Sequence, residues 1–382
     1  MTSFIFLLIE FIDELVFGFT DSAWPLIRQD LGLNYVQIGL ALSLPGMIAT
    51  FIEPFLGVLG DVWKRRVLIL GGGIFFVASL FLTAASRSYI PLLLSFVLFF
   101  PSSGAFVSLS QASLMDIAPE RHEQNMARWT FAGSLGVVVG PLLLSLLLAI
   151  GFGWQPGFLM LGLFSTVTLL AARKTIPREI EAYAKLPSFG LVFKGLGQAF
   201  QAVRNPGVVR WLVLLEFSDL MLDVLYGFLA LYFVDVAGFS AGEAALAVAV
   251  WTGLGLLGDF ILIPLVERVP GLAYLRWSVA LELVLFPAFL LAPTAWVKLV
   301  LVGLMGFFNA GWYAILKGNL YSSMPGQSGS VMALDNVSGF FGKLLPFGVG
   351  VVAQAYGLQS AMWLLLAGPL ALFFFLPRKR GQ

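Results

Sequence analysis

The sequence predicts an all-α polytopic membrane protein with twelve transmembrane helices in two pseudo-symmetric six-helix bundles. Three observations lead to this prediction: the composition, the number of long apolar segments, and an internal repeat. Of the 382 residues, 59% are hydrophobic and only 11% are charged, and the mean hydropathy is +0.93. Soluble domains carry roughly 25% charged residues, so the composition is typical of a chain that resides in a lipid bilayer.

The apolar segments are numerous enough for twelve membrane helices, each of which needs about 20 mostly apolar residues. Trp24, Trp154 and Trp296 lie near predicted helix ends, where tryptophan commonly anchors a helix at the membrane surface. The first segment carries acids and lacks a basic start, so we do not expect a cleavable signal peptide. The twelve helices are expected at residues 4–27, 35–60, 66–86, 89–115, 126–150, 154–173, 209–234, 242–266, 272–292, 295–320, 328–354 and 358–376.

The second half of the chain repeats the first at an offset of 206 positions. The stretch Glu10-Phe11-Ile12-Asp13 returns as Glu216-Phe217-Ser218-Asp219. Parallel repeats are typical of transporters, whose polar sites lie near the middle of the bilayer. We therefore expect a six-helix bundle at 1–173, a cytoplasmic linker at 174–207 and a second bundle at 208–382. The same offset relates Glu53 to Asp259, Asp61 to Glu267, Pro119 to Pro325, Met126 to Met332, Gly133 to Gly339, Gly136 to Gly342, and Gly151 to Gly357.

Lysine and arginine predict the orientation, because cytoplasmic loops carry an excess of these residues. With the N-terminus inside, the inner loops and the C-terminal tail hold 17 of them, and the outer loops hold three, Arg28, Arg87 and Lys298. We therefore expect an integral plasma (inner) membrane protein with both termini in the cytoplasm.

Acidic residues inside two apolar segments are the main candidates for function. A carboxylate at membrane depth is costly unless it faces water, pairs with a partner or holds a proton. In the first segment four acids, Asp21 included, share a helical stripe about 100° wide. Asp13 and Asp219 are foremost, since each lies near mid-membrane and has a symmetry mate. The acids expected to bind substrate or protons are Glu10, Asp13, Glu14, Glu216, Asp219 and Asp223.

Such closely spaced acids disfavour simultaneous ionisation, so we expect some to hold a proton near neutral pH and to titrate as a coupled set. The acids of the first and seventh segments are related by the repeat, so we expect them to face one another. Glu53 and Asp259 form a further symmetric pair, as proton carriers or as halves of structural ion pairs. Glu282 has no symmetry mate and either pairs laterally or is protonated, and Asp116 is expected to be solvated or to cap a helix.

Two lysines, Lys317 and Lys343, lie inside apolar segments. Buried cations in membranes usually pair with acids, so each lysine is either part of a structural salt bridge or a competitor for a carboxylate that substrate or protons displace. Asn309 and Tyr313 precede Lys317 in the tenth segment, and their mixture of amide and aromatic groups suits the wall of a binding cavity.

The end of the second segment resembles a loop signature of the major facilitator superfamily. That signature runs Gly-x-x-x-Asp-Arg-x-Gly-Arg-Arg between helices two and three. Gly57, Asp61, Arg65 and Arg66 match it, whereas Val62 replaces its first arginine. The resemblance implies a twelve-helix fold whose halves rock around a central cavity, and it implies that this cluster acts in gating.

The fifth segment contains Gly140-Pro141, which is similar to the glycine-proline signature of exporters in the same superfamily. The usual pattern ends in two further glycines, but Leu142 follows here. The resemblance implies export and a gating role for Gly140 and Pro141. Small residues at these spacings also serve ordinary helix packing, so both interpretations stay open.

Taken together, these features predict a secondary active transporter that works by alternating access, with proton-coupled export of small cationic or neutral amphipathic organic molecules (multidrug-type). The alternatives are a Mn²⁺ or Fe²⁺ exporter, since carboxylates suit such cations, and a proton-coupled uptake carrier for a sugar or other polar solute. The chain has no cysteine and one histidine, His122, so neither a metal site nor a cofactor is expected. It carries no HExxH motif, and its sole histidine lies in a predicted loop, so we expect no enzyme and no catalytic residues. The expected partners are the substrate, protons and the lipid bilayer, without nucleic acid, and the chain is expected to act as a monomer.

Overall fold

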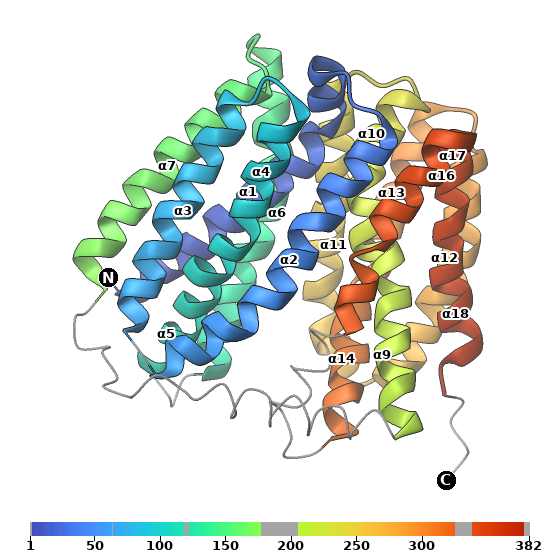
Figure 1. Cartoon of the computed structure of the whole chain (residues 1–382). Coiled ribbons are helices and arrows are strands. Elements are labelled where there is room, and N and C mark those ends of the chain that lie inside the picture. The colour runs from blue at the N-terminus through green and yellow to red at the C-terminus, as the bar shows by residue number, and fades with distance from the viewer. Residues whose placement is uncertain (1, 63, 118–121, 177–204, 325–337, 378–382) are drawn as a thin grey trace. The chain divides into compact units, whose positions relative to one another are not determined.

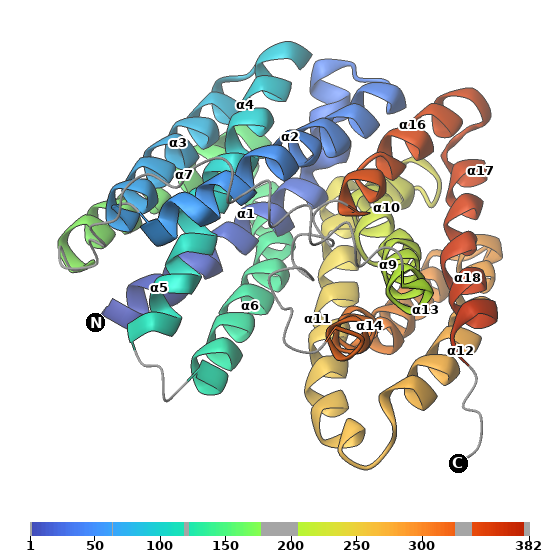
Figure 2. The ribbon, with the colours of Figure 1, turned by 60° about the horizontal axis from the view of Figure 1, so that its bottom comes forward.

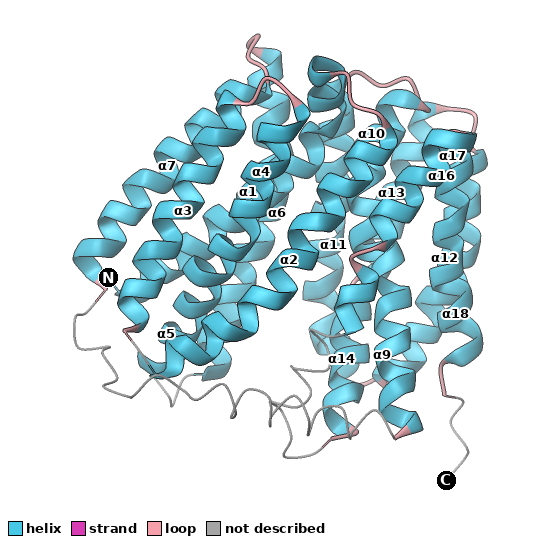
Figure 3. Cartoon of the chain, in the orientation of Figure 1, coloured by secondary structure: helices cyan, strands magenta, loops and turns pink. Residues whose placement is uncertain are grey.

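A computed structural model describes the chain except for residues 1, 63, 118–121, 177–204, 325–337 and 378–382. The described residues form helices joined by short loops, without a strand (Figure 3). The chain divides into two compact units, Met1–Val192 and Phe193–Gln382, which we call unit 1 and unit 2. Each unit is built by helices that follow one another up and down (Figure 1).

Unit 1 contains long helices that match the first six predicted segments within a few residues. Its fourth segment is one continuous helical stretch with a π-helical turn in the middle, η1. The helices of unit 1 are α1 (Thr2–Leu31), α2 (Tyr35–Val62), α3 (Arg65–Ala85), α4 (Tyr89–Ser103), η1 (Gly104–Ser108), α5 (Leu109–Ile117), α6 (His122–Ala149) and α7 (Trp154–Thr175).

Unit 2 follows the remaining predicted segments wherever it is described, with more interruptions. A π-helical turn, η3, divides the seventh segment, and the tenth is broken between two helices. Residues 338–342 are also helical. The further helices are α9 (Pro206–Asp219), η3 (Leu220–Val224), α10 (Leu225–Asp235), α11 (Ala241–Val266), α12 (Gly271–Leu291), α13 (Ala295–Asn309), α14 (Trp312–Ser322), α16 (Leu345–Tyr356), α17 (Leu358–Met362), η4 (Trp363–Leu366) and α18 (Ala367–Phe375).

By length and composition, nine helical stretches in the described part of the chain could cross a membrane. Helix α1 and the stretch from α9 to α10 are not among these nine, and they are the two stretches that carry the repeated acid motif. Apolar side chains lie exposed along the helices, as on Phe75, Trp277 and Phe374. A large exposed apolar surface on a helical protein of this composition fits contact with lipid.

Glycines in α6 let α1 approach until the two backbones touch. A Cβ atom at Gly136 would lie 2.4 Å from the carbonyl oxygen of Phe11, and one at Gly140 would lie 2.5 Å from the amide nitrogen of Phe19. Close backbone approach through small residues is the usual way in which membrane helices associate. The helix pair α1–α6 is therefore the most intimate packing in unit 1 (Figure 2).

The regular helices are interrupted at repeat-related positions of the two units. The π-helical turn η1 begins at Gly104, and the break between α13 and α14 begins 206 positions later, at Ala310. At the break Ala310 is extended, and Gly311 adopts a left-handed conformation with φ 73°. Glycine meets this requirement without the steric strain of a Cβ atom. Interruptions of this kind often mark functional positions in helices.

Lys298 is buried inside α13, which corrects its assignment to an outer loop. Its side chain is 6% exposed. Its Nζ donates to the hydroxyl oxygen of Tyr232 at 2.8 Å and to the carbonyl oxygens of Phe289 and Leu290 at 2.7 and 3.2 Å. Those carbonyls belong to the last turn of α12, where no intrahelical donor is available. A lysine there satisfies the orphan acceptors and complements the negative end of the helix.

Two of the three tryptophans interpreted as surface anchors are buried instead. Trp24 is 1% exposed, and Trp154 is fully buried. The indole nitrogen of Trp154 donates to the Asp30 carboxylate at 2.7 Å, so this residue joins the start of α7 to the end of α1 rather than facing lipid. Trp296 is 79% exposed, as expected of an anchor.

Candidate functional site

Asp13 lies in the interior of unit 1 with one oxygen satisfied. Helix α1 runs unbroken past it, so the stripe of acids expected from the sequence is kept. The hydroxyl of Ser103, the last residue of α4, donates to Asp13 Oδ2 at 3.0 Å. The other oxygen, Oδ1, is buried and has no hydrogen-bond partner among the described residues. Oδ1 can therefore bind a proton, or it can accept a hydrogen bond from water or from a substrate group.

Glu10 and Glu14 lie against the glycine face of α6. A Cβ atom at Gly133 would lie 2.6 Å from Glu10 Oε1, and one at Gly136 would lie 2.9 Å from Glu14 Cβ. Glu10 is 8% exposed, and the Trp129 side chain, also in α6, hydrogen-bonds to it. The glycines thus make room for the carboxyl groups as well as for the backbone of α1.

Glu53 joins the same cluster from α2. A Cβ atom at Gly104, the first residue of η1, would lie 2.9 Å from Glu53 Cγ. The charges of Glu53 and Asp13 lie close enough to interact. The sequence predicted Glu53 as part of a separate pair, but the structure places it beside the acids of α1. We call Glu10, Asp13, Glu14 and Glu53 the acid cluster.

A small hollow lies further along α1, toward its C-terminal end. Asp21 is the charged residue in its wall, and the buried indole nitrogen of Trp24 has no hydrogen-bond partner among the described residues. Half of the remaining lining residues are phenylalanines, and aromatic rings favour cations and flat apolar groups. The sequence placed Asp21 on the acid stripe but gave no sign of the phenylalanines, which come from three helices. The hollow is lined by Val16, Phe17, Thr20, Asp21, Trp24, Ala41, Leu80, Thr83, Phe96, Phe99, Phe100 and Phe158.

Unit 2 repeats the contact between the acid motif and a glycine. A Cβ atom at Gly342 would lie 2.0 Å from Glu216 Oε2, much as Gly133 accommodates Glu10. Asp219 ends α9 directly before the π-helical turn, and Asp223 lies within that turn, η3. That the acids of α9 face those of α1 stays a prediction.

The internal lysines of unit 2 both have neighbours. Lys343 interacts electrostatically with Asp223, which brings the eleventh segment and η3 together. The ammonium group of Lys317 lies 5.5 Å from the centre of the Tyr313 ring, one turn earlier in α14. Tyr313 is half exposed, whereas Asn309 is buried at the end of α13. That Asn309, Tyr313 and Lys317 line the wall of a binding cavity stays a prediction.

Asp259 in α11 lies at the break of the tenth segment. The backbone N–H of Gly311 donates to its carboxylate. Its symmetry mate Glu53 lies against Gly104, at the interruption of the fourth segment. In both units the acid of the second repeat helix thus contacts an interrupted helix, a relationship that no single segment of the sequence reveals.

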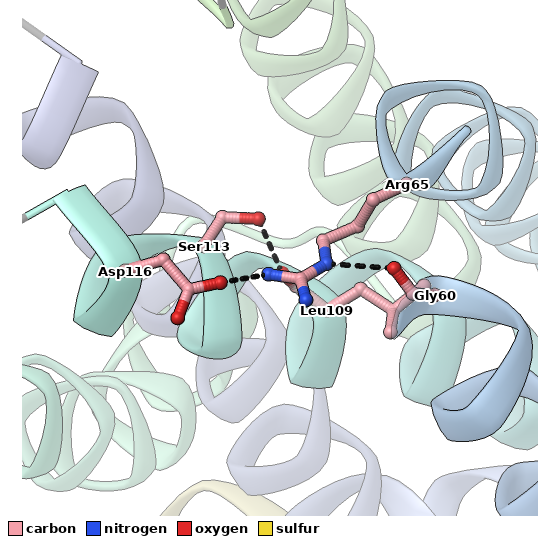
Figure 4. Close-up of polar contacts among 5 residues, drawn as sticks. All are labelled: Gly60, Arg65, Leu109, Ser113 and Asp116. Carbon is pink, nitrogen blue, oxygen red and sulfur yellow. Dashed lines mark hydrogen bonds and ion pairs between the residues drawn. The ribbon is translucent and has the colours of Figure 1, made fainter. Parts of the chain in front are cut away.

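The loop signature forms a polar bridge at the end of unit 1 (Figure 4). Arg65 donates through Nε to the carbonyl oxygen of Gly60 at 2.9 Å and through Nη1 to Asp116 Oδ2 at 2.5 Å. The guanidinium group therefore connects the end of α2 to α5. Asp116 was expected to be solvated or to cap a helix, so its role as the partner of Arg65 was missed. Its place near a helix end gave no signal, because its partner is 51 positions away.

Arg66 satisfies the end of another helix. Its guanidinium donates to the carbonyl oxygens of Ile176 and Arg173 at 3.1 and 2.7 Å, at the C-terminal end of α7. Arg65 and Arg66 thus tie α3 to three other helices of unit 1. The side chain of Asp61 and the position of a side chain at Gly57 lie outside the described residues. Gly140 and Pro141 lie at the α1–α6 contact, where a Cβ atom at Gly18 would be 3.1 Å from Pro141 Cδ.

Comparisons with known proteins agree on one family. Residues 6–346 match the family described as Major Facilitator Superfamily. An uncharacterized MFS-type transporter of Bacillus subtilis (strain 168), YtbD, is 23% identical over 351 residues, which are 89% of this chain and 85% of that protein.

Solved structures share the fold at low identity. A mutant form of the nucleoside transporter NupG superposes with a TM-score of 0.80 at 15% identity over 98% of both chains. A bacterial homologue of the human lysosomal transporter Spinster superposes with a TM-score of 0.74 at 18% identity, over 98% of this chain and 93% of that one. Because the family match spans most of this chain, residues 6–346 of 382, the chain belongs to the major facilitator superfamily and is a secondary transporter rather than an enzyme.

Proposed function

We propose that this transporter couples proton movement to the export of small cationic or neutral amphipathic organic molecules. The observation that carries the proposal is the acid cluster of unit 1, in which three carboxyl groups of α1 and one of α2 lie together. Carboxyl groups that crowd one another away from bulk water are expected to exchange protons when their access to water changes.

The substrate class follows from the groups around α1. Half of the residues that line the hollow beside Asp21 are aromatic, and rings with a nearby carboxylate favour a positively charged or flat apolar molecule. An organic anion would be repelled by the acids of both repeats. We therefore place Glu10, Asp13 and Glu14, with Glu216, Asp219 and Asp223, along the path of substrate and protons, and Lys317, Lys343, Asn309 and Tyr313 beside it.

Gating is assigned to the ends of the helices in unit 1. Arg65 and Arg66 hold α2, α5 and α7 to α3. If these helices move relative to α3, the hydrogen bonds of the two arginines must break, and otherwise the four helices move together. Gly57 and Asp61 belong to the same signature. Gly140 and Pro141 would act through the α1–α6 contact. We further propose bundles at 1–173 and 208–382, a cytoplasmic linker at 174–207, both termini in the cytoplasm of the inner membrane, and a monomer.

The alternative to export that a comparison supports is the uptake of a polar solute. NupG, which superposes over nearly the whole chain, is a nucleoside transporter. The divalent-metal alternative finds less support. In the described part of the chain no three His, Cys, Asp or Glu side chains, those of the acid cluster included, are arranged so that they could hold one metal ion.

Ligand-dependent thermal unfolding of the purified protein in detergent tests the proposal. A ligand that binds only the folded state raises the unfolding temperature. The panel comprises lipophilic cations, nucleosides, sugars, Mn²⁺ and organic anions, each at acidic and at alkaline pH. Stabilisation by lipophilic cations, stronger at alkaline pH where protons compete less, supports the proposal. Stabilisation by nucleosides or sugars alone would replace export by uptake, and stabilisation by Mn²⁺ alone would establish the metal alternative.

A further inference from the structure

Glu282 in α12 is a fully buried carboxyl group outside the acid cluster and outside the repeated acid motif. Neither of its oxygens has a hydrogen bond of good geometry among the described residues. Within the described part of unit 2, the polar group that interacts with it is the Asn309 side chain. Asn309 is itself 4% exposed, and neither its oxygen nor its nitrogen has another partner in the described chain. The polar atoms of the two side chains thus meet in the interior of unit 2 with only one another as partners.

The fold does not require a carboxyl group at this position. Phe76 occupies the repeat-related position in unit 1, 206 residues earlier, and is fully buried. Its ring packs against Phe99 and Phe106, with centroids 5.0 and 5.6 Å away. Unit 1 therefore fills this place with an aromatic ring, whereas unit 2 carries the desolvation cost of a carboxyl group.

No cation offsets a negative charge on Glu282 in the described part of unit 2. Helix α12 packs against α13, α14, η4 and α18. The last two carry no titratable residue. Lys298 in α13 is held by Tyr232 and by carbonyl oxygens at the other end of that helix, about 16 Å of helix away from Asn309. Lys317 in α14 lies over the Tyr313 ring, beyond the break.

The remaining charged groups near this place are also engaged elsewhere. On α12 itself, Arg276 donates to the carbonyl oxygen of Pro377, and the Tyr274 hydroxyl donates to backbone carbonyls of the break. Asp259 in α11 accepts from the N–H of Gly311. Asn309 is therefore the side chain in the described part of unit 2 that is available to hydrogen-bond to Glu282.

We propose that Glu282 and Asn309 form a proton-binding site, in which a neutral carboxylic acid pairs with the amide. The acid O–H donates to Asn309 Oδ1, and the amide N–H donates to the carbonyl oxygen of the acid, so the oxygens and the nitrogen all gain a partner. An ionised carboxylate has no donor, and Asn309 Oδ1 would then lie unpaired beside it. On release, the O–H bond of the acid breaks and the proton passes to water that has reached the site.

Because Asn309 adjoins the break between α13 and α14, protonation of Glu282 affects how firmly the break is held. Asn309 is the last residue of α13, directly before the break, which side chains of α11 and α12 hold in place. The Tyr274 hydroxyl donates to the carbonyl oxygens of Phe308 and Ala310 at 3.3 and 3.2 Å. The indole nitrogen of Trp312 donates to Ser278 Oγ at 2.8 Å. Loss of the proton from Glu282 removes the acid's donation to Asn309, and the break loosens.

This inference rests on the proposed proton coupling for its role in transport, but the site can be tested without substrate. Infrared difference spectra of the purified protein between about pH 5 and about pH 9 report the carbonyl stretch of protonated carboxylic acids. We expect one such band to be absent in Glu282→Gln and retained in Glu267→Gln, a matched change of an exposed glutamate. Spectra of Glu282→Gln that equal those of the unchanged protein would show that Glu282 neither gains nor loses a proton between these pH values and would overturn the proposal.

Asn309→Leu tests the pairing even if Glu282→Gln does not fold. This variant keeps the acid and removes its partner, so the band of Glu282 should shift to the frequency of a carboxylic acid without a hydrogen bond. An unchanged band would mean that Asn309 is not the partner. The same spectra in sodium chloride and in choline chloride identify the cation, because loss of the band only in sodium would make this a sodium site and refute the proton assignment.

Hydrogen–deuterium exchange of peptides around residues 307–315 tests the link to the break. Amide exchange becomes faster at higher pH in any peptide. In the unchanged protein, the exchange rate of these peptides should rise with pH by more than this intrinsic effect, whereas in Glu282→Gln it should rise by the intrinsic effect alone. Identical pH dependence in both proteins would refute the mechanical role. Failure of lipophilic cations to bind would instead contradict the proposed function and leave this result unaffected.

Discussion

The Ser103 hydroxyl donates to Asp13 Oδ2 at 3.0 Å and so joins the middle of α1 to the last residue of α4, immediately before η1. This hydrogen bond fixes one side of a buried carboxyl group and leaves the other oxygen open. A π-helical turn beside it gives the fourth segment an irregular backbone at the acid cluster.

Asp13→Asn should abolish proton-coupled transport and leave the fold nearly unchanged. The amide oxygen still accepts from Ser103, so the packing is kept, but an amide cannot exchange the proton. Transport by proteoliposomes under an imposed pH gradient measures the loss, and Asp219→Asn should behave alike. Asp235→Asn, an exposed acid at the end of α10, serves as the control. Coupled transport at the unchanged rate in both interior variants would refute the assignment.

Gly136→Ala and Gly140→Ala should each destabilise the protein by about 1–3 kcal/mol, the usual range for overpacking. At both positions the added methyl group meets backbone atoms of α1 nearer than 3.0 Å, so the helices must separate. Thermal unfolding in detergent checks the effect.

Gly71→Ala is the matched control for these two changes. It lies in α3, and no atom lies within 4 Å of the added Cβ. Because alanine favours a helix by roughly 0.5–1 kcal/mol over glycine, this variant should be as stable as the unchanged protein or more so. Equal destabilisation of all three variants would show that the α1–α6 contact has no special role.

Arg65→Lys should slow turnover without much loss of stability. Lysine has one donor group and cannot span Gly60 and Asp116 with the two arms of a guanidinium. The Asp116 side chain is 65% exposed, and ion pairs of such acids contribute at most about 1 kcal/mol. The transport rate and the unfolding temperature, measured together, separate the two effects. Asp116→Asn should resemble Arg65→Lys and add little to it in the double variant, whereas additive losses would mean that the residues act independently.

Lys298→Met should destabilise unit 2 by about 1–3 kcal/mol, the cost of leaving buried acceptors unpaired. The change removes the donor for the Tyr232 hydroxyl and for two carbonyl oxygens at the end of α12. Lys64→Met, an exposed cation, is the control. Thermal unfolding should separate the two variants clearly, and equal unfolding temperatures would show that the buried contacts contribute nothing.

The helical segments and the repeat could be predicted from the sequence because each depends on local pattern or on simple identity at one offset. The partners of Arg65 and Glu53 could not. Asp116 and Gly104 are distant in the chain, and only the fold brings them close. The burial of Lys298 was missed because the count of basic residues assumes that lysines near a helix end face water, whereas carbonyl oxygens at a helix end can replace that water.

The buried position of Lys298 also bears on how the chain enters the membrane during synthesis. A charged side chain within an apolar segment opposes insertion of that segment on its own. Tyr232, Phe289 and Leu290 precede Lys298 in the chain and therefore leave the ribosome first. We expect α13 to be released into lipid together with α12, as a hairpin whose lysine already has its acceptors.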